Sequence, residues 1–289
     1  MLITRKSFLK AGIKAGLAAA GLSAGLARPV LAKEWTTIRV ATEGAFPPFN
    51  ATAPDGTLIG FEPDMCAEIA KRQKVKITLL AQAWDGIIPG LNDGKYDAIV
   101  DGMSITPKRE EIIAFSQPYT SSPSGFTVLK DGPLANMPGT GTRIALDDDA
   151  AAKEAAAIIG KALAGKTVAV QTATIQFDFL NRYLKDAVTV RTYAAGPDTY
   201  LDLKNGRADA VLSSVTNAAP FIKRGRGELV LSGYGFTGGV LGRGSAIGLR
   251  KSDPELKAIF DAGLQSMIAD GSLTALSMKW FELDVTPKA

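Results

Sequence analysis

The chain has 289 residues, of which 46% are hydrophobic and 21% charged, a balance that is ordinary for a globular protein of one large or two modest domains. It contains no histidine and a single cysteine, so the commonest general base and metal ligand is missing and no internal disulfide can form. The glycine-rich GGVLGRG at 238–244 lacks the Lys-Ser/Thr of a phosphate-binding loop. The composition therefore gives little support to catalysis, and no cofactor or metal is indicated.

The amino-terminal residues 1–32 differ from the rest of the chain. Basic residues precede and interrupt an Ala/Gly/Leu run, and Val30-Leu31-Ala32 fits a small-residue cleavage site, so a secretory signal peptide is predicted here. The apolar run is short and broken by Lys14, which disfavours a membrane anchor. TRKSFLKAG is similar to the twin-arginine export pattern, with Lys6 in the second Arg position.

The basic charge of the chain belongs to this leader. It carries five basic residues and no acidic ones, so the 33 basic residues of the whole chain become 28 after cleavage, against 29 acidic residues, a net charge of −1. A nucleic-acid partner therefore has no electrostatic support.

From residue 37 onward, short apolar strands alternate with amphipathic helices. Strands are expected at residues 38–42, 75–80, 98–100, 167–170 and 188–193, and helices at residues 63–72, 84–92, 150–163 and 174–185. This alternation indicates an α/β fold. Cys66 falls within an expected helix and is predicted to be a buried thiol.

Two segments of the chain repeat one design. LNDGKYDAIVD at 91–101 and LKNGRADAVLS at 203–213 each run through a helix end, a glycine, a polar turn, an Asp and a buried strand. Chance similarity is the alternative, because a glycine cap before a strand is common. The repeat favours two related lobes. Ligands in such sheets bind beyond the carboxyl ends of the strands, so residues 101–104 and 213–214 should face one cleft.

The segment DAIVDGMSITPKREEIIAFS at 97–116 leaves a buried strand and enters a polar stretch. Thr106 and Pro107 are typical of a helix start, so free backbone N–H groups and a positive dipole end should gather beside Ser104. An anion would be stabilised there.

Arg109 follows two residues after this expected helix start. Its planar guanidinium is suited to hold a carboxylate through two parallel hydrogen bonds, and Gly102 allows a ligand close to the backbone. The alternative is an exposed ion pair between Arg109 and the glutamates at 110 and 111, which would contribute little.

GMSITPKREEIIAFSQPY closely resembles the signature of family 3 extracytoplasmic solute-binding proteins, the polar amino-acid receptors of bacterial ABC importers. The resemblance extends over nearly the whole chain after the leader. It implies a two-lobed periplasmic-binding-protein type II fold with the ligand cleft between the lobes. Residues 33–124 and 233–289 would form lobe 1, and residues 125–232 would form lobe 2. It also implies a periplasmic receptor that delivers its ligand to an inner-membrane ABC permease, and we expect a monomer.

The resemblance assigns the carboxylate end of the ligand to a first group of residues. In that family the Arg matching Arg109 holds the ligand's α-carboxylate, helped by the Ser matching Ser104 and by backbone groups near Gly102, with Met103 counted in the site. VAVQTATIQFDF is similar to the Gln-Gly-Thr/Ser-Thr segment of the family, which makes Thr174 a carboxylate contact at a helix start.

A second group would meet the far end of the ligand. The acidic residue matching Glu43 contacts the ligand's cation in that family, and the aromatic matching Phe46 packs on its chain. Trp84 takes the other aromatic position, and Asp101 would add a second negative charge. Without the resemblance, a solvated Glu43 and core aromatic residues would be the default interpretation. Two aromatic faces beside a carboxylate suit an aliphatic chain that ends in a guanidinium or ammonium group.

The sequence departs from the family at one position. DAVLSSVTNAAP places Ser214 where many members have an Asp that binds the ligand's α-ammonium group. A neutral hydroxyl is a weaker partner for a primary ammonium. Either another carboxylate substitutes for it, or the ligand's nitrogen is substituted, as in opines. QTATIQ and GGVLGRG are also more similar to opine receptors than to lysine/arginine receptors.

The expected ligand is therefore arginine, lysine, ornithine or an opine-type derivative. The alternatives are a secreted cyclohexadienyl-dehydratase-like enzyme on the same fold and a signalling sensor domain. The sensor is disfavoured because the sequence lacks a kinase-like segment.

Overall fold

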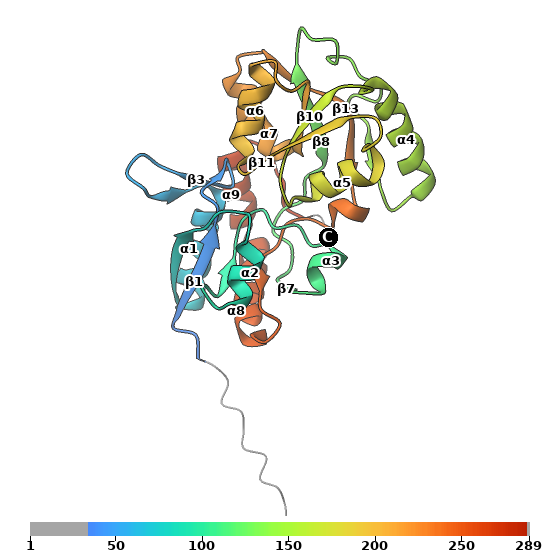
Figure 1. The fold of residues 1–289 in the computed structure, drawn as a ribbon. Coiled ribbons are helices and arrows are strands. Elements are labelled where there is room, and N and C mark those ends of the chain that lie inside the picture. The colour runs from blue at the N-terminus through green and yellow to red at the C-terminus, as the bar shows by residue number, and fades with distance from the viewer. Residues whose placement is uncertain (1–33, 288–289) are drawn as a thin grey trace, which may run out of the picture. The chain divides into compact units, whose positions relative to one another are not determined.

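The computed structural model describes residues 34–287, which contain two large mixed sheets with helices on both faces of each (Figure 1). The leader at residues 1–32 lies outside the described residues, so its assignment as a signal peptide stays a prediction. In the part of the chain that is described, no helix is both long enough and apolar enough to cross a membrane.

The first sheet has the strand order β5-β1-β6-β14-β7, with β1 parallel to β5 and β6, and β14 antiparallel to β6 and β7. Its strands are β1 (Thr37–Thr42), β5 (Lys76–Ala81), β6 (Ala98–Ile99), β7 (Ala114–Phe115) and β14 (Gly248–Leu249). Its helices are α1 (Phe61–Gln73), α2 (Ile87–Asn92), the single turn α3 (Pro107–Glu110), α8 (Pro254–Ala269) and α9 (Ser272–Phe281). A small antiparallel sheet beside it consists of β2 (Ala45–Phe46), β3 (Asn50–Thr52) and β4 (Leu58–Ile59).

Alternation along β1 explains why this sheet is covered on both faces. Ile38 and Val40 belong to the apolar cluster under α1, α8 and α9, whereas Ala41 belongs to the cluster under α2. Cys66 lies in α1 within the first of these clusters and is a free, buried thiol, as the sequence predicts.

The second sheet has the strand order β11-β10-β12-β8-β13-β9, in which β10 is parallel to β11 and β12 while β8 is antiparallel to β12 and β13. Its strands are β8 (Ser124–Leu129), β9 (Arg143–Ala145), β10 (Thr167–Gln171), β11 (Thr189–Tyr193), β12 (Ala210–Ser214) and β13 (Leu229–Thr237). Its helices are α4 (Asp149–Ala162), α5 (Ile175–Tyr183), α6 (Gly196–Lys204) and α7 (Val215–Arg224), and a short 3₁₀ turn, Gly239–Leu241, follows β13.

Alternation along β10 separates two apolar layers on this sheet as well. Val168 and Val170 pack in the cluster that includes residues of α4 and α5, and Ala169 packs in the cluster that includes residues of α6 and α7. Both sheets thus have the doubly covered α/β architecture that the sequence predicts.

The repeated segments of the sequence make the same contact in both sheets. The aspartate of each segment accepts a hydrogen bond from a backbone N–H of the neighbouring strand, and this contact is called the aspartate staple. In the first, Asp97 accepts a hydrogen bond from the backbone N–H of Arg39 in β1 (3.0 Å to Oδ2). In the second, Asp209 accepts one from the backbone N–H of Thr167 in β10 (2.8 Å to Oδ2). Each Asp therefore joins the turn before one strand to the start of the neighbouring strand.

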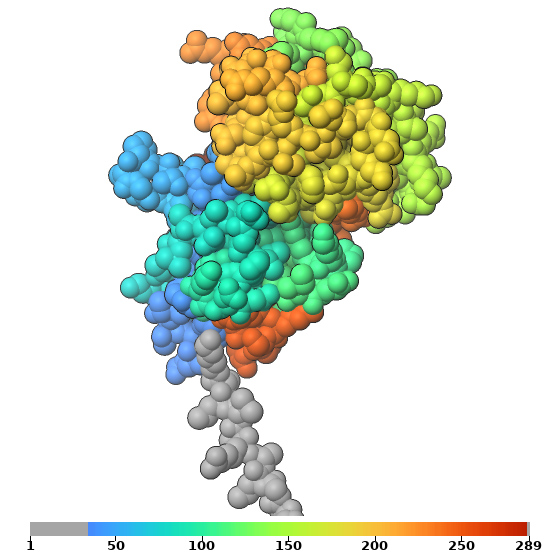
Figure 2. Space-filling model, in the orientation of Figure 1, coloured from blue at the N-terminus to red at the C-terminus, as the bar shows by residue number. Residues whose placement is uncertain are grey.

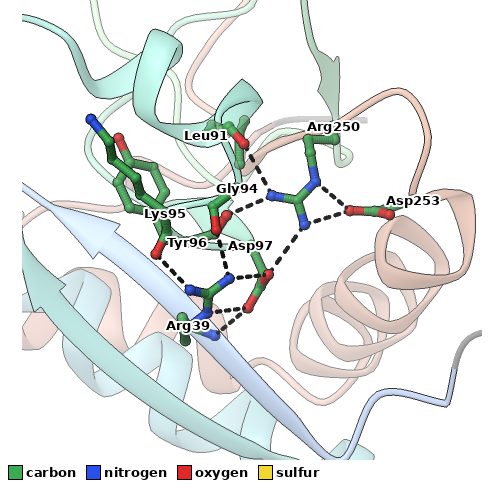
Figure 3. Close-up of polar contacts among 8 residues, drawn as sticks. All are labelled: Arg39, Leu91, Gly94, Lys95, Tyr96, Asp97, Arg250 and Asp253. Carbon is green, nitrogen blue, oxygen red and sulfur yellow. Dashed lines mark hydrogen bonds and ion pairs between the residues drawn. The ribbon is translucent and has the colours of Figure 1, made fainter.

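The first sheet carries an additional ion-pair network at this staple (Figure 3). Asp97 is paired with the guanidinium groups of both Arg39 (2.9 Å) and Arg250 (3.1 Å), and Arg250 also pairs with Asp253 (2.7 Å). Arg250 also donates to the carbonyl oxygen of Leu91 (3.0 Å) and to that of Tyr96 (2.6 Å). The network fastens the segment that follows β14 to the turn between α2 and β6, although the two are far apart in sequence.

Two differences from the expected elements concern the site. The helix expected at residues 84–92 begins only at Ile87, because Gly86 has a positive φ of 93° that a right-handed helix cannot continue, so Trp84 lies in a loop. The strand β13 continues to Thr237 and so crosses the lobe boundary expected after residue 232. The boundaries of the lobes themselves stay a prediction.

Candidate functional site

A cavity of about 340 Å³ lies beyond the carboxyl ends of strands from both sheets. Figure 2 shows the first-sheet segments, in blue to teal with the returning C-terminal segment in orange to red, against the second-sheet segments, in green to orange. Nine of the ten residues that the sequence nominates line this cavity: Glu43, Phe46, Trp84, Asp101, Gly102, Ser104, Arg109, Thr174 and Ser214. Met103 does not line it. Its side chain is fully buried in the core of the first sheet with Ile87 and Ile99.

Arg109 is held in the cavity by backbone contacts. Its N–H donates to the hydroxyl of the helix cap Thr106 (3.2 Å), as the cap predicts, although α3 is only one turn long. One guanidinium nitrogen donates to the carbonyl of Ser104 (3.0 Å) and another to the carbonyl of Ala173 (3.5 Å). The guanidinium also lies 5.3 Å from the ring centroid of Trp84.

The charge of Arg109 has no carboxylate partner within residues 34–287. The exposed ion pair considered from the sequence is therefore not formed, because Glu110 pairs with Arg243 instead (2.9 Å). Burial lowers the pKa of Arg109 to about 10, with Asp178 opposing that effect, so the group stays a cation at neutral pH. A half-buried guanidinium that has no ion-pair partner and lines a cavity is suited to receive an anion.

Aromatic side chains form one wall of the cavity. Phe46 stacks on Phe49 with ring centroids 5.0 Å apart, and both rings line the cavity together with Trp84. Gly102 permits the placement of Phe46, because it has a positive φ of 56° and a Cβ there would lie 2.7 Å from the ring.

Glu43 and Asp101 place two carboxyl groups elsewhere in the cavity. Glu43 follows β1 and accepts a hydrogen bond from the side-chain amide of Gln171 in β10 (2.8 Å). Burial raises the pKa of Glu43 to about 7, and the bond from Gln171 acts in the opposite direction. Asp101 follows β6 and is buried, with Oδ1 accepting from Asn50 (2.7 Å).

The two hydroxyl groups nominated in the second sheet have the same local role. Thr174 caps α5, where its oxygen accepts from the N–H of Phe177 (3.2 Å). Ser214 caps α7, where its oxygen accepts from the N–H of Asn217 (3.2 Å). Both place a helix start at the cavity wall. Ser214 remains a neutral group at the position where the resembled family often has a carboxylate.

Sequence reasoning missed several residues of the cavity and its support. Gln171 is the last residue of β10, at the carboxyl end of a strand of the second sheet, so the strand-end rule that nominated Asp101 after β6 could have nominated it as well. Asn217 lines the cavity and donates to the carbonyl of Pro47 (2.9 Å). Glu62 lies in α1 behind the cavity, and no pattern in the sequence marked it, because charged positions in helices are usually solvated.

The described residues offer no group of three His, Cys, Asp or Glu side chains arranged to hold a metal ion. The cavity instead presents two guanidinium groups, three carboxyl groups, aromatic faces and hydroxyls, which are the groups of a pocket for a polar organic molecule.

Comparison with known proteins places this arrangement in a family. The model of the bacterial extracellular solute-binding proteins, family 3, matches residues 38–283. The octopine-binding periplasmic protein of Rhizobium meliloti is 41% identical over 276 residues, which are 89% of this chain and 94% of that protein. The L-cystine-binding protein of Escherichia coli is 33% identical over 255 residues, 88% of this chain and 86% of that protein.

A solved structure gives the same result. The periplasmic His/Glu/Gln/Arg/opine family-binding protein from Silicibacter pomeroyi, in complex with lysine, is similar with a TM-score of 0.71 at 34% identity. The match covers 87% of this chain and 100% of that chain.

Proposed function

Because this chain belongs to the bacterial extracellular solute-binding proteins of family 3, we propose that its cavity binds a cationic amino acid or an opine-type derivative of one. It is a periplasmic binding protein of the amino-acid class. The relatives named above are binding proteins and not enzymes, so they favour this function over the dehydratase alternative.

The observation that carries the ligand class is the separation of charge in the cavity. Arg109 provides a positive group, and Glu43 and Asp101 provide carboxyl groups that form no ion pair with it. A ligand that bears a carboxylate and a cation on one aliphatic chain would pair with both. Phe46 and Trp84 would cover that chain, and a cation near either ring would gain about 0.5 to 2 kcal/mol.

The choice between a free amino acid and an opine depends on Ser214. A primary α-ammonium group would meet only a neutral hydroxyl there, which is a weak partner for it. The substituted nitrogen of an opine depends less on a charged partner at this position, and its additional arm would occupy space in the cavity. The octopine-binding relative supports the opine alternative, and the lysine in the solved relative supports the free amino acid.

A thermal-shift panel tests the ligand class. Arginine, lysine, ornithine, octopine and nopaline are the cationic compounds, and glutamate, leucine and cystine are the comparators. A ligand at about 100 times its Kd stabilises by about 2.7 kcal/mol, which corresponds to a rise in Tm of about 5 to 10 °C. Stabilisation by the comparators and by none of the cationic compounds would contradict the charge argument.

The protein is further proposed to act as a monomer that presents its liganded form to an inner-membrane ABC permease. The family supports the transporter context. Reconstitution of uptake with candidate inner-membrane ABC permeases from the same organism tests this partner, since transport should require the binding protein and should be lost with Arg109→Ala.

A further inference from the structure

Three carboxyl groups lie together at one part of the cavity, those of the half-buried Glu43 and the buried Asp101 in its lining and that of the buried Glu62 behind it. Glu43 follows β1, Asp101 follows β6, and Glu62 lies in α1. Asp101 is 3% exposed and Glu62 1% exposed. Within residues 34–287 none of the three forms an ion pair with a Lys or Arg side chain. A protein does not hold several unpaired carboxylates in one buried place without protons or donors to offset their charge.

Hydrogen bonds distinguish Glu62 from Asp101. Glu62 accepts from the backbone N–H of Gly102 (2.6 Å), from the side-chain amide of Asn50 (2.7 Å) and from the hydroxyl of Tyr119. Asp101 accepts at Oδ1 from Asn50 (2.7 Å) and from the hydroxyl of Thr42 (3.5 Å), its buried Oδ2 has no hydrogen-bond partner, and the backbone N–H of Glu43 also favours its charged form. Burial raises the pKa of Glu62 as well, but its three donors oppose that effect, whereas one oxygen of an ionised Asp101 would have no donor.

Asn50 fixes this arrangement. Its Oδ1 accepts from the N–H of Gly44 (2.8 Å), so its amide nitrogen must face the carboxyl groups, and that nitrogen donates to both Glu62 and Asp101. Glu62 in turn holds the backbone of Gly102, which borders the cavity. Glu62 is thus a positioning residue for Asp101 and for the backbone beside it.

We propose that Asp101 carries a proton on Oδ2 in the absence of a bound cation, and that a cationic ligand displaces this proton while Glu62 stays ionised. The O–H bond of Asp101 breaks, the proton passes to a base in the solvent, and the carboxylate that remains pairs with the ligand's cation. This coupling rests on the proposed function, because it requires that the ligand bear a positive charge.

Burial and the neighbouring acidic groups favour a proton on Asp101, and two hydrogen-bond donors oppose it. Burial raises the pKa of Asp101 well above its usual value, and the charges of Glu62 and Glu43 raise it further, while the N–H of Glu43 and the Asn50 side chain oppose them. The other titratable groups that interact with the cluster are Tyr96, Tyr119 and, through Glu62, Cys66, and all of these are acids. The ligand would supply the missing positive charge.

The sign of the coupling follows from linkage. The pKa of Asp101 is raised in the free protein and would be lowered by a bound cation, so protons are released on binding at any pH between these two values. Affinity for a cationic ligand should therefore rise with pH through that window, with a contribution from Glu43, whose pKa is raised to about 7 by burial. The ratio of the affinities for arginine and for a neutral amino acid should decrease as the pH falls, because protonated carboxyl groups are neutral and form no ion pair with a cationic ligand.

Calorimetry with arginine in two buffers tests the release. Phosphate and Tris have very different ionisation enthalpies, so a released proton makes the binding heat depend on the buffer, by an amount equivalent to about one proton from Asp101 where that group is protonated in the free protein and ionised in the complex. Asp101→Asn should release fewer protons than the wild type. The matched control is Asp147→Asn, which removes a carboxylate from the same cavity outside the cluster and should leave the proton count unchanged.

Glu62→Gln tests the positioning role through the pH at which proton release is maximal, a quantity that a simple loss of packing would not change. Removing the charge of Glu62 should lower the pKa of Asp101, so the pH at which release is maximal should shift downward. A purely structural role would weaken affinity equally at every pH, and that result would overturn the role given to Glu62.

Three results would overturn the proton release. The first is that arginine binds the wild type normally with equal heats in both buffers at every pH, which removes the coupling and leaves the proposed function intact. The second is that Asp101→Asn releases as many protons as the wild type. If that variant fails to fold, carboxyl ¹³C titration of the free wild-type protein decides, and an Asp101 pKa in the ordinary aspartate range contradicts the proposal. Absence of binding by arginine, lysine, ornithine and octopine would instead overturn the proposed function and this inference together.

Discussion

Arg109 and Arg243 both line the cavity, but their surroundings give them different expected roles. Arg243 is 65% exposed on its side chain and paired with Glu110 at 2.9 Å, so solvent and a carboxylate already satisfy it. Arg109 is bonded only to carbonyl oxygens and stacks near Trp84. An anion that enters the cavity would gain far more from the unpaired guanidinium than from the paired one.

Arg109→Ala is therefore expected to weaken ligand binding by about 2 to 5 kcal/mol, because the ligand's carboxylate would be buried without its charged partner. The affinity of Arg109→Lys should lie between those of the wild type and of Arg109→Ala, since an ammonium group keeps the charge but cannot form two parallel hydrogen bonds. The matched control Arg243→Ala should change affinity by less than about 1 kcal/mol. Calorimetry with the tightest ligand of the panel measures all three. Equal losses for the two alanine variants would mean that Arg109 does not hold the carboxylate.

Ser214 is expected to set the preference between free amino acids and opines. Ser214→Asp places a carboxylate at the start of α7, where it can pair with a primary ammonium and also cap the helix. The ratio of Kd for octopine to Kd for arginine should increase by about tenfold or more, since one added ion pair in a partly buried site contributes about 1.4 kcal/mol or more. An unchanged ratio would show that Ser214 does not face the ligand's nitrogen.

At the scale of elements, the repeated staple is stronger in the first sheet than in the second. Asp97 is buried and paired with Arg39 and Arg250, whereas Asp209 pairs only with the half-exposed Lys166 at 3.4 Å. Burial alone would raise the pKa of Asp97, but hydrogen bonds from both arginines bring it below the usual range. The two aspartates therefore form a natural pair of test sites that share one backbone role.

Asp97→Asn should lower the free energy of unfolding by about 3 kcal/mol at pH 7, because Arg250 would lose a partner in a mostly buried network. Asp209→Asn should lower it by only about 1 kcal/mol, the value of an ordinary hydrogen bond. Since the pKa of Asp97 is lowered by folding, its contribution is present above the unfolded-state pKa and is lost as the pH falls through the folded-state pKa. Urea unfolding at neutral pH and at a pH well below the ordinary aspartate pKa of about 4 measures this. A difference between Asp97→Asn and wild type that does not shrink in acid would contradict the argument.

At the scale of the whole molecule, hydrogen bonds cross the cavity between segments of the two sheets. Gln171 donates to Glu43 (2.8 Å), Trp84 donates to the carbonyl of Ala173 (3.3 Å), and Asn217 donates to that of Pro47 (2.9 Å). A ligand that contacts both sides adds to these bonds, so it favours a closed arrangement over an open one.

Ligand binding is therefore expected to reduce the radius of gyration without consuming the ligand. Small-angle scattering with and without arginine or octopine measures the change, and mass spectrometry of the recovered ligand checks for turnover. Arg109→Ala at the same ligand concentration is the control, since it should stay in the unliganded form. A radius that does not change on saturation, or a chemically altered ligand, would contradict this mechanism.

Local pattern was sufficient for much of the architecture. The alternation of apolar strands and amphipathic helices, the caps at Thr106 and the Asp that precedes each repeated strand depend on neighbours in sequence, and the structure contains all of them. The position of Arg109 was predictable for the same reason, because a capped turn after a strand end fixes where the next side chains lie.

Other features were decided only by tertiary structure. Met103 was nominated with its neighbours, but its side chain faces the core of the first sheet, and only the path of the chain after Gly102 determines which side it takes. The cluster of Glu43, Glu62 and Asp101 is assembled from β1, α1 and β6, so no local window of sequence contains it.

The sequence by itself thus determined the fold class, the repeated strand design and the residue types at the strand ends, because these follow from periodicity and backbone preference within short segments. The tertiary structure alone decided which carboxyl groups are unpaired, that Arg250 joins the returning segment to Asp97, and that Gln171 reaches Glu43. The physical reason is that burial and charge pairing depend on distances between segments remote in sequence, and those distances exist only once the sheets have packed.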